Sequence, residues 1–167
     1  ANITVEDNIN PIANCQNQTV QLDASGNGSI TVSDIDNGSN DACGIQSTSI
    51  DITTFDCSNV GSNTVTLTVT DNNNNVSTCT STVTVQDNIN PIALCQNLTI
   101  QLDASGSASI TDSDIDNGSN DNCGVQSTSI DITTFDCSNV GSNTVTLTVT
   151  DVNNNTSTCT ATVTVQD

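Results

Sequence analysis

The residues of this chain that could do chemistry are carboxylates and cysteines. Its 167 residues include 19 Asp and Glu and 8 Cys, but no Lys, Arg or His. The chain therefore has no ordinary general base near neutral pH, no Schiff-base lysine and no Ser–His or Cys–His pair, so we expect it not to be an enzyme. Paired Asp residues alone can hydrolyse a glycoside, but every such candidate here occurs twice in a repeated sequence.

The carboxylates have no cationic side chain to pair with. Each one must face water, accept hydrogen bonds from neutral donors or bind a cation. The formal net charge is −19, and no cationic side chain is present to contact a phosphate group. We therefore expect no nucleic-acid partner. No apolar run is long enough to span a membrane, and we expect no membrane insertion.

The chain is one unit written twice. Cys15, Cys43, Cys57 and Cys79 recur 80 residues later as Cys95, Cys123, Cys137 and Cys159. We expect two repeats, residues 8–86 and 87–167. Residues 1–7 match the last strand of a repeat, either as the end of a preceding repeat or as a strand exchanged with another molecule. Near-identical tandem units supply length or valency, which favours a structural or adhesive role.

The elements that must position these residues are β-strands. Val, Ile and Thr alternate with a period of two, and Asp, Asn, Gly and Ser form turns between the alternating segments. In the first repeat we expect strands at residues 16–22, 28–33, 45–51, 52–57, 64–70 and 76–86, a long polar loop at 34–44 and no helix. This pattern predicts a small all-β sandwich. The only aromatic residues are Phe55 and Phe135, so each core is thin and needs disulfides or metal for stability.

Several segments resemble the hyalin repeat (HYR) family of extracellular modules. They are Cys15 before the first strand, NDACG at Asn40–Gly44, TDNNNNVSTC at Thr70–Cys79 and VTVQD at Val83–Asp87. The composition is also similar to repeat arrays of flavobacterial-type surface adhesins. The resemblance covers both repeats and implies tandem immunoglobulin-like β-sandwiches with an 80-residue period, located outside the cell or on its surface. Asn74 departs from the family, which usually has Gly at this turn.

The cysteines predict disulfides formed in an oxidising compartment, because their number is even and no CxxC occurs. Cys79 lies on the inward face of the last strand, and Cys15 precedes the first strand, which runs beside the last in an immunoglobulin-like sandwich. Three pairings are possible within each repeat. We expect Cys15–Cys79 and Cys43–Cys57 in the first repeat, and Cys95–Cys159 and Cys123–Cys137 in the second.

In the same topology the chain start, the long polar loop and the last turn lie at one end of the sandwich. The predicted metal ligands there are Asp7, Asp34, Asp36, Asp41 and Asp71, with Asp87, Asp114, Asp116, Asp121 and Asp151 in the second repeat. Calcium prefers such oxygen ligands, and a divalent ion would relieve their mutual repulsion. The loop is not an EF-hand, because Gly38 falls one position early and Ile45 stands where the bidentate Glu belongs. The same residues also form ordinary turns, and both interpretations stay open.

The sequence thus predicts an extracellular structural or adhesive protein, an extended rod or filament stapled by disulfides and stiffened by calcium. Its expected partners are neighbouring copies, including strand complementation through Ala1–Glu6, and extracellular matrix, carbohydrate or a cell surface. The alternative is an adhesin module that binds carbohydrate or ice through rows of threonine, such as Thr64, Thr66, Thr68 and Thr70. The same rows are expected on the solvent side of any amphipathic strand.

Overall fold

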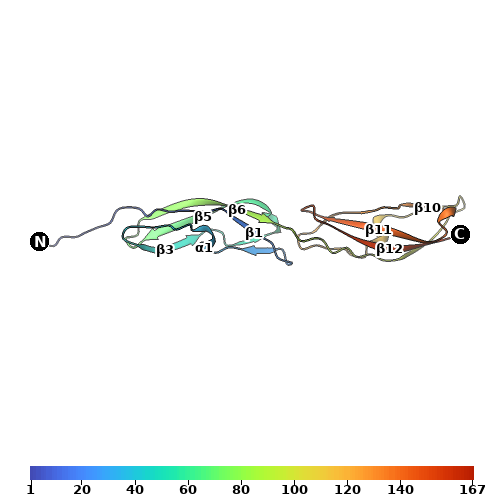
Figure 1. The fold of residues 1–167 in the computed structure, drawn as a ribbon, viewed down its shortest axis with the longest axis horizontal. Helices are drawn as coiled ribbons and strands as arrows, with labels where there is room; N and C mark the ends of the chain where they lie inside the picture. The colour runs from blue at the N-terminus through green and yellow to red at the C-terminus, as the bar shows by residue number, and fades with distance from the viewer. The chain divides into compact units, whose positions relative to one another are not determined.

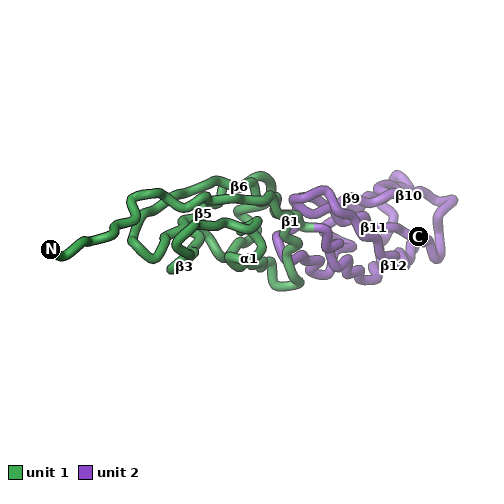
Figure 2. Tube along the Cα trace, turned by 60° about the vertical axis from the view of Figure 1, so that its left-hand side comes forward, with its two compact units in different colours: residues 1–87 green, residues 88–167 purple.

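Alternating valine and threonine side chains build two long strands at the centre of each repeat. The computed structural model describes residues 1–167, and their contacts divide them into two units, Ala1–Asp87 and Asn88–Asp167 (Figure 2). In the first unit, β5 (Gly61–Asp71) and β6 (Val76–Gln86) form an antiparallel hairpin. The apolar side chains of β5 are fully buried and the threonines between them are partly exposed, so one face of the hairpin forms the core.

Two edge strands widen this hairpin into a four-stranded sheet of order β1-β6-β5-β3 (Figure 1). β1 (Gln18–Gln21) pairs in parallel with β6, and β3 (Ile45–Ile50) pairs antiparallel with β5. A second sheet of two short strands, β2 (Asn27–Ser29) and β4 (Thr54–Asp56), carries the buried Phe55. The unit is a small β-sandwich in which the first and last strands lie side by side, as predicted.

The second unit has the same arrangement, with a four-stranded sheet of order β7-β12-β11-β9 and a two-stranded sheet of β8 and β10. The elements are β7 (Leu98–Gln101), β8 (Ser107–Ser109), α2 (Asp112–Ile115), β9 (Val125–Ile130), β10 (Thr134–Asp136), η2 (Cys137–Asn139), β11 (Gly141–Asp151) and β12 (Thr156–Gln166). Ile115 of α2, Phe135 of β10 and the valines of β11 and β12 form one hydrophobic cluster. Both sheets and the helical turn therefore share a single core with one aromatic ring.

The prediction of no helix is wrong, because a helical turn replaces the end of the predicted strand 28–33 and the start of the long polar loop. This turn, α1 (Val32–Ile35), follows Thr31, whose backbone N–H and hydroxyl both donate to the carboxylate of Asp34 at 2.7 Å. Ile35 is fully buried, so the turn adds an apolar side chain to the core. Four residues are too few to show a helical period in a sequence. No helix in the structure has the length and hydropathy that a membrane span requires.

The segment before the first repeat, Ala1–Asp7, forms no strand. Figure 1 shows it leading away from the first sandwich. Ile3 is 89% exposed and Val5 is 91% exposed, whereas their repeat equivalents in β6, Val83 and Val85, are at most 1% exposed. The segment thus has the sequence of a last strand, but its apolar side chains are not buried as they are in a last strand.

Each repeat has two opposite ends, set by the length of its central hairpin. At the head end, which we define by Asp7, Asp41 and Asp71 in the first repeat, β5 turns into β6. At the tail end, η1 (Cys57–Asn59) leads into β5, and β6 finishes beside the start of β5. β5 contains 11 residues, and at about 3.3 Å per residue the two ends lie roughly 30 Å apart.

Candidate metal centre

One disulfide in each repeat ties the start of the repeat to its last strand. Cys15 is bonded to Cys79 with their Cα atoms 5.9 Å apart, and Cys95 is bonded to Cys159 with their Cα atoms 5.8 Å apart. These are the pairings predicted between the start of each repeat and its last strand. Cys79 lies opposite Leu67 in the middle of the hairpin, so the bond fastens the incoming chain to the centre of the sheet.

The two other predicted disulfides, Cys43–Cys57 and Cys123–Cys137, are wrong. Cys43 and Cys137 are free and exposed thiols, so neither bond can form as predicted. Cys43 lies at the head end, where the side chain of Asn72 donates to its carbonyl oxygen at 2.8 Å, whereas Cys57 opens η1 at the tail end. A disulfide needs Cα atoms within about 7 Å, far less than the length of β5 that separates these two cysteines.

A buried aspartate organises the turn at the head end of each repeat. Asp71 is fully buried, and its carboxylate accepts hydrogen bonds of 2.8 Å from the backbone of Asn73 and from both the backbone and the side chain of Asn75. Burial alone would raise the pKa of Asp71, but these hydrogen bonds outweigh it and hold the pKa below its ordinary value. Asn74 has a φ of 70°, a left-handed conformation that Asn tolerates, so this turn does not require the Gly of hyalin repeats.

In the second repeat this turn brings three carboxylates together. One oxygen from each of Asp87, Asp121 and Asp151 lies within 4.8 Å of the other two. Asp87 is 5% exposed and Asp151 is 0% exposed, so water screens the repulsion between these groups poorly. Asp151 accepts the same three hydrogen bonds as Asp71, at 2.7 to 2.8 Å. The carboxylates are therefore held close together by neutral donors, without any positive charge.

Two buried oxygens at the head end of the second repeat accept no hydrogen bond. Oδ2 of Asp121 accepts from the backbone of Cys123 and Gly124 at 2.8 and 3.2 Å, whereas its Oδ1 is buried without a donor. Oδ1 of Asn153 is also buried without a donor. Leaving such a group unsatisfied costs about 1–3 kcal/mol. A cation bound by the three carboxylates would offset the repulsion between them.

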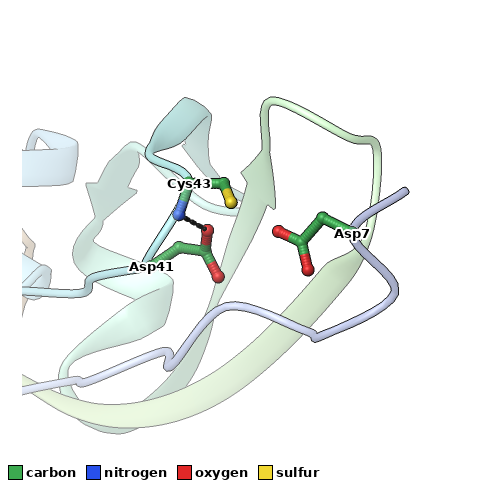
Figure 3. Close-up of side chains that lie close together, drawn as sticks. All are labelled: Asp7, Asp41 and Cys43. Atoms are coloured by element: carbon green, nitrogen blue, oxygen red, sulfur yellow. Dashed lines mark hydrogen bonds between the residues drawn. The ribbon is translucent and has the colours of Figure 1, made fainter. Parts of the chain in front are cut away.

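In the first repeat a thiol takes the place of the third carboxylate. The ligand atoms of Asp7, Asp41 and Cys43 lie within 4.8 Å of one another, and Figure 3 shows the Cys43 sulfur and the Asp41 carboxylate facing Asp7. A hydrogen bond to Asp7, the charge of Asp7, burial and the charges of Asp41 and Asp71 together raise the pKa of the Cys43 thiol. Cys43 is thus a protonated and weaker ligand at neutral pH.

Sequence reasoning missed the position of Cys43 beside Asp7, because it assigned this cysteine to a disulfide. The available signal was the spacing of Asp41 and Cys43, two residues apart. That spacing lets the carboxylate of Asp41 accept from the backbone N–H of Cys43 at 2.8 Å, which turns both side chains toward the same side of the loop (Figure 3).

Five of the predicted ligands are outside these clusters: Asp71, which holds the head-end turn of the first repeat, and Asp34, Asp36, Asp114 and Asp116. Asp34 closes the helical turn, and hydrogen bonds from the backbone and side chain of Thr31 lower its pKa. Asp36 accepts from the backbone of Ser39 at 2.9 Å and forms a bridge with Cys15, near the middle of the sandwich. Residues 36–40 run antiparallel to residues 12–15, so only the far end of the loop, at Asp41, reaches the head end. Asp114 and Asp116 occupy the same places in the second repeat.

Threonine rows cover the outer face of each central hairpin. In the second repeat Thr144, Thr146, Thr148 and Thr150 lie directly opposite Thr162, Thr160, Thr158 and Thr156. Opposed threonines stabilise a sheet through their own contacts, so the rows have a structural role that requires no ligand. They also form the surface that the alternative function, binding of carbohydrate or ice, would use.

Comparison with known proteins gives a general likeness and no family. No family model and no curated protein matches the chain, so the resemblance to hyalin repeats and bacterial adhesins stays a prediction. Mouse clustered PcdhgC3 EC1-3 is 12% identical with a TM-score of 0.43, covering 95% of this chain and 68% of that one. The Protocadherin GammaB4 extracellular domain is 12% identical with a TM-score of 0.45, covering 96% of this chain and 33% of that one. DIP-gamma IG1+IG2 is 10% identical with a TM-score of 0.38, covering 94% and 97%.

The fold and the site together define a class of module rather than a named family. Each repeat is an all-β sandwich with one internal disulfide and an acidic head end.

Proposed function

We propose that this chain is a segment of an extracellular structural or adhesive array in which calcium binds at the head end of each repeat. The observation that carries the proposal is the cluster of Asp87, Asp121 and Asp151, whose oxygens lie within 4.8 Å of one another in a chain without a single cationic side chain. The buried Oδ1 of Asp121, which accepts no hydrogen bond, supports a cation at this cluster. A disulfide in each repeat supports an oxidising, extracellular location.

Calcium fits this donor set better than other common divalent ions. Its six to eight ligands are oxygens of carboxylates, amides and backbone, and it accepts irregular geometry. Magnesium demands a near-octahedral shell and keeps several of its waters, and zinc prefers nitrogen and sulfur. The second repeat offers only oxygens at this place, so we assign it the stronger site. The first repeat offers a protonated thiol beside Asp7 and Asp41 and has the weaker site.

The ion would act mechanically, by fastening the segment that leads into a repeat. In the second repeat Asp87 belongs to that segment, Asp121 to the long loop and Asp151 to the turn between the long strands. An ion held by all three fixes the direction in which the chain enters the sandwich. Without the ion their charges repel one another and the incoming segment loosens, so an array of such repeats is stiff only in calcium.

Calcium at ten times its Kd is expected to raise the free energy of unfolding of each repeat that binds it by about 1.4 kcal/mol relative to excess EDTA. The measurement is thermal and denaturant unfolding of the oxidised chain, with magnesium and with sodium chloride of equal ionic strength as controls. Small-angle scattering of the same samples reports the stiffness of the chain. Identical unfolding in calcium and EDTA would show that the carboxylates only solvate the surface.

We also propose that copies of the chain associate by strand complementation through Ala1–Glu6. Ile3 and Val5 are exposed, and the valines at the equivalent places of β6 are buried. An extended segment with a strand sequence and an unpaired backbone is suited to add to the edge of a sheet.

Deleting Ala1–Glu6 is expected to abolish this non-covalent association, because the added strand is lost and both sandwiches stay intact. Analytical ultracentrifugation of the deleted and complete chains measures it, in a background where Cys43 and Cys137 are both replaced by serine. A variant with Ile3→Asp and Val5→Asp should behave like the deletion. Equal association of all three chains would rule out strand complementation.

A further inference from the structure

Two cysteines remain free, and they occupy different positions of the repeat. Cys43 is free in the first repeat and Cys137 in the second. Their repeat equivalents are Cys123 and Cys57, and both of these are disulfide-bonded. Each of the two positions therefore forms a disulfide in one repeat and carries an exposed thiol in the other. The chain therefore carries one free thiol at each of these two positions of the repeat.

The free Cys137 is held in the same local geometry as its bonded equivalent Cys57. The sulfur of Cys137 lies 3.8 Å from the carbonyl oxygen of Gly106, and the sulfur of Cys57 lies 3.8 Å from that of Gly26. The two glycines have φ values of 77° and 75°. A Cβ atom on Gly106 would come within 2.7 Å of the Cys137 sulfur, so the glycine makes room for the thiol. The free and the bonded cysteine therefore have the same surroundings on the side of the glycine.

The free Cys43 likewise shares the backbone setting of its bonded equivalent Cys123. The backbone N–H of Cys43 donates to Asp41 at 2.8 Å, and that of Cys123 donates to Asp121 at 2.8 Å. In each repeat the following glycine accepts from the turn between the long strands at 3.1 Å. The first repeat thus presents the thiol of Cys43 on the same loop, in the same fold, that supports a disulfide in the second repeat.

We propose that Cys137 of one copy of this chain forms a disulfide with Cys43 of a second copy, so that copies join head to tail. The partner is a second copy because it brings the complementary thiol: Cys43 and Cys137 are both free, and the equivalents of both, Cys123 and Cys57, are disulfide-bonded. The oxidant is a small disulfide of the glutathione type. One thiol loses its proton and attacks this disulfide, releasing one small thiol, and the second thiol then attacks the mixed disulfide and releases the other. Two protein thiols and one small disulfide become one protein disulfide and two small thiols.

Charge disfavours a bond between two Cys43 residues. Cys43 lies among Asp7 and Asp41 at the head end, and a bond between two Cys43 residues would bring two such acidic clusters together without any cation to separate them. Cys137 opens η2 at the tail end, opposite to the head-end turn. A bond from Cys137 to Cys43 meets only one of these clusters and can be repeated at both ends of every copy.

The test uses two variants of the complete chain, Cys43→Ser and Cys137→Ser, each with a single exposed thiol. Each variant is incubated alone, and the two are incubated together, in oxidised and reduced glutathione with excess EDTA. Because EDTA is present throughout, failure of the calcium proposal does not affect the outcome. We expect each variant alone to stay monomeric on a non-reducing gel, the mixture to give a covalent dimer, and the unaltered chain to give a ladder of multimers. The double variant is the control and stays monomeric.

Mass spectrometry of the dimer after cleavage at aspartate identifies the joined peptides, since trypsin has no site in this chain. The proposal predicts one cross-linked peptide containing Cys43 and Cys137. A dimer of the Cys43→Ser variant alone, or of the Cys137→Ser variant alone, would show that like ends join and would overturn it. A mixture that stays monomeric although thiol titration finds one reactive thiol per chain would overturn it too.

Discussion

Replacing Cys95 and Cys159 together by alanine is expected to lower the free energy of unfolding of the second repeat by about 4 kcal/mol. The bond closes a loop with a sequence separation of 64 residues, and the unfolded chain gains most of the entropy of that loop when the bond is absent. The hydrophobic cluster of the repeat contains one aromatic ring, Phe135, so little other stabilisation remains. A loss of this size is a large part of the stability of a small domain.

Denaturant unfolding of the oxidised variant and the unaltered chain measures this effect. Cys43→Ala is the matched control, because it removes a cysteine without removing a disulfide, and it should change stability by no more than about 0.5 kcal/mol. The variant lacking Cys15 and Cys79 should show the same loss in the first repeat. A change below about 1 kcal/mol for either double variant would mean that the sandwich holds the start of the repeat without the bond.

Replacing Asp71 by alanine is expected to lower the free energy of unfolding by about 3 kcal/mol, measured in EDTA so that no metal contributes. The buried carboxylate accepts three hydrogen bonds from Asn73 and Asn75, and alanine leaves their donors without a partner. Asp71→Asn is the matched control. Its side-chain oxygen can still accept both backbone bonds, so we expect it to cost about 1 kcal/mol. Asp151→Ala and Asp151→Asn repeat the comparison in the second unit.

The contribution of Asp71 should also depend on pH in a defined direction. The hydrogen bonds hold its pKa in the folded chain below the ordinary value of 3.8, and such a group stabilises the fold above its unfolded pKa. The difference between Asp71→Ala and the unaltered chain should therefore be constant near neutral pH. It should shrink as the pH falls below 3.8 and through the folded pKa. A difference that grows as the pH falls would show that the hydrogen-bonded group in the folded chain is not the charged Asp71 carboxylate.

The strands and one disulfide of each repeat follow from local features of the sequence. Val65, Leu67 and Val69 alternate with threonine, and all three valine and leucine side chains are fully buried. Because side chains of a strand alternate between faces, the same alternation puts Cys79 within reach of the start of the repeat. The bond to Cys15 could therefore be predicted once the first strand was placed beside the last.

The surroundings of Cys43 could not be predicted, because they depend on distance along the sandwich. Cys43 and Cys57 are close in sequence, but β3 (Ile45–Ile50) lies between them and carries the chain from the head end to the middle of the sandwich, from where β4 (Thr54–Asp56) leads on to Cys57. The prediction that Asp36 lies at the head end was wrong for a similar reason. Its residues 36–40 run along residues 12–15, so Asp36 stays near the middle of the sandwich and only Asp41 reaches the cluster.

The most direct test of calcium binding at the head end is titration calorimetry of the oxidised chain and its Asp121→Asn variant. Asp121 supplies a buried oxygen without a donor, and asparagine at this position can still close the same turn. Asp103→Asn is the control, because it removes the same charge from the turn after β7, at the tail end of the second repeat. We expect calcium to bind the unaltered chain and the control alike, and Asp121→Asn to weaken the stronger site at least about tenfold, or about 1.4 kcal/mol. Equal affinity of all three chains, or no heat of binding at all, would contradict a calcium site at the head end.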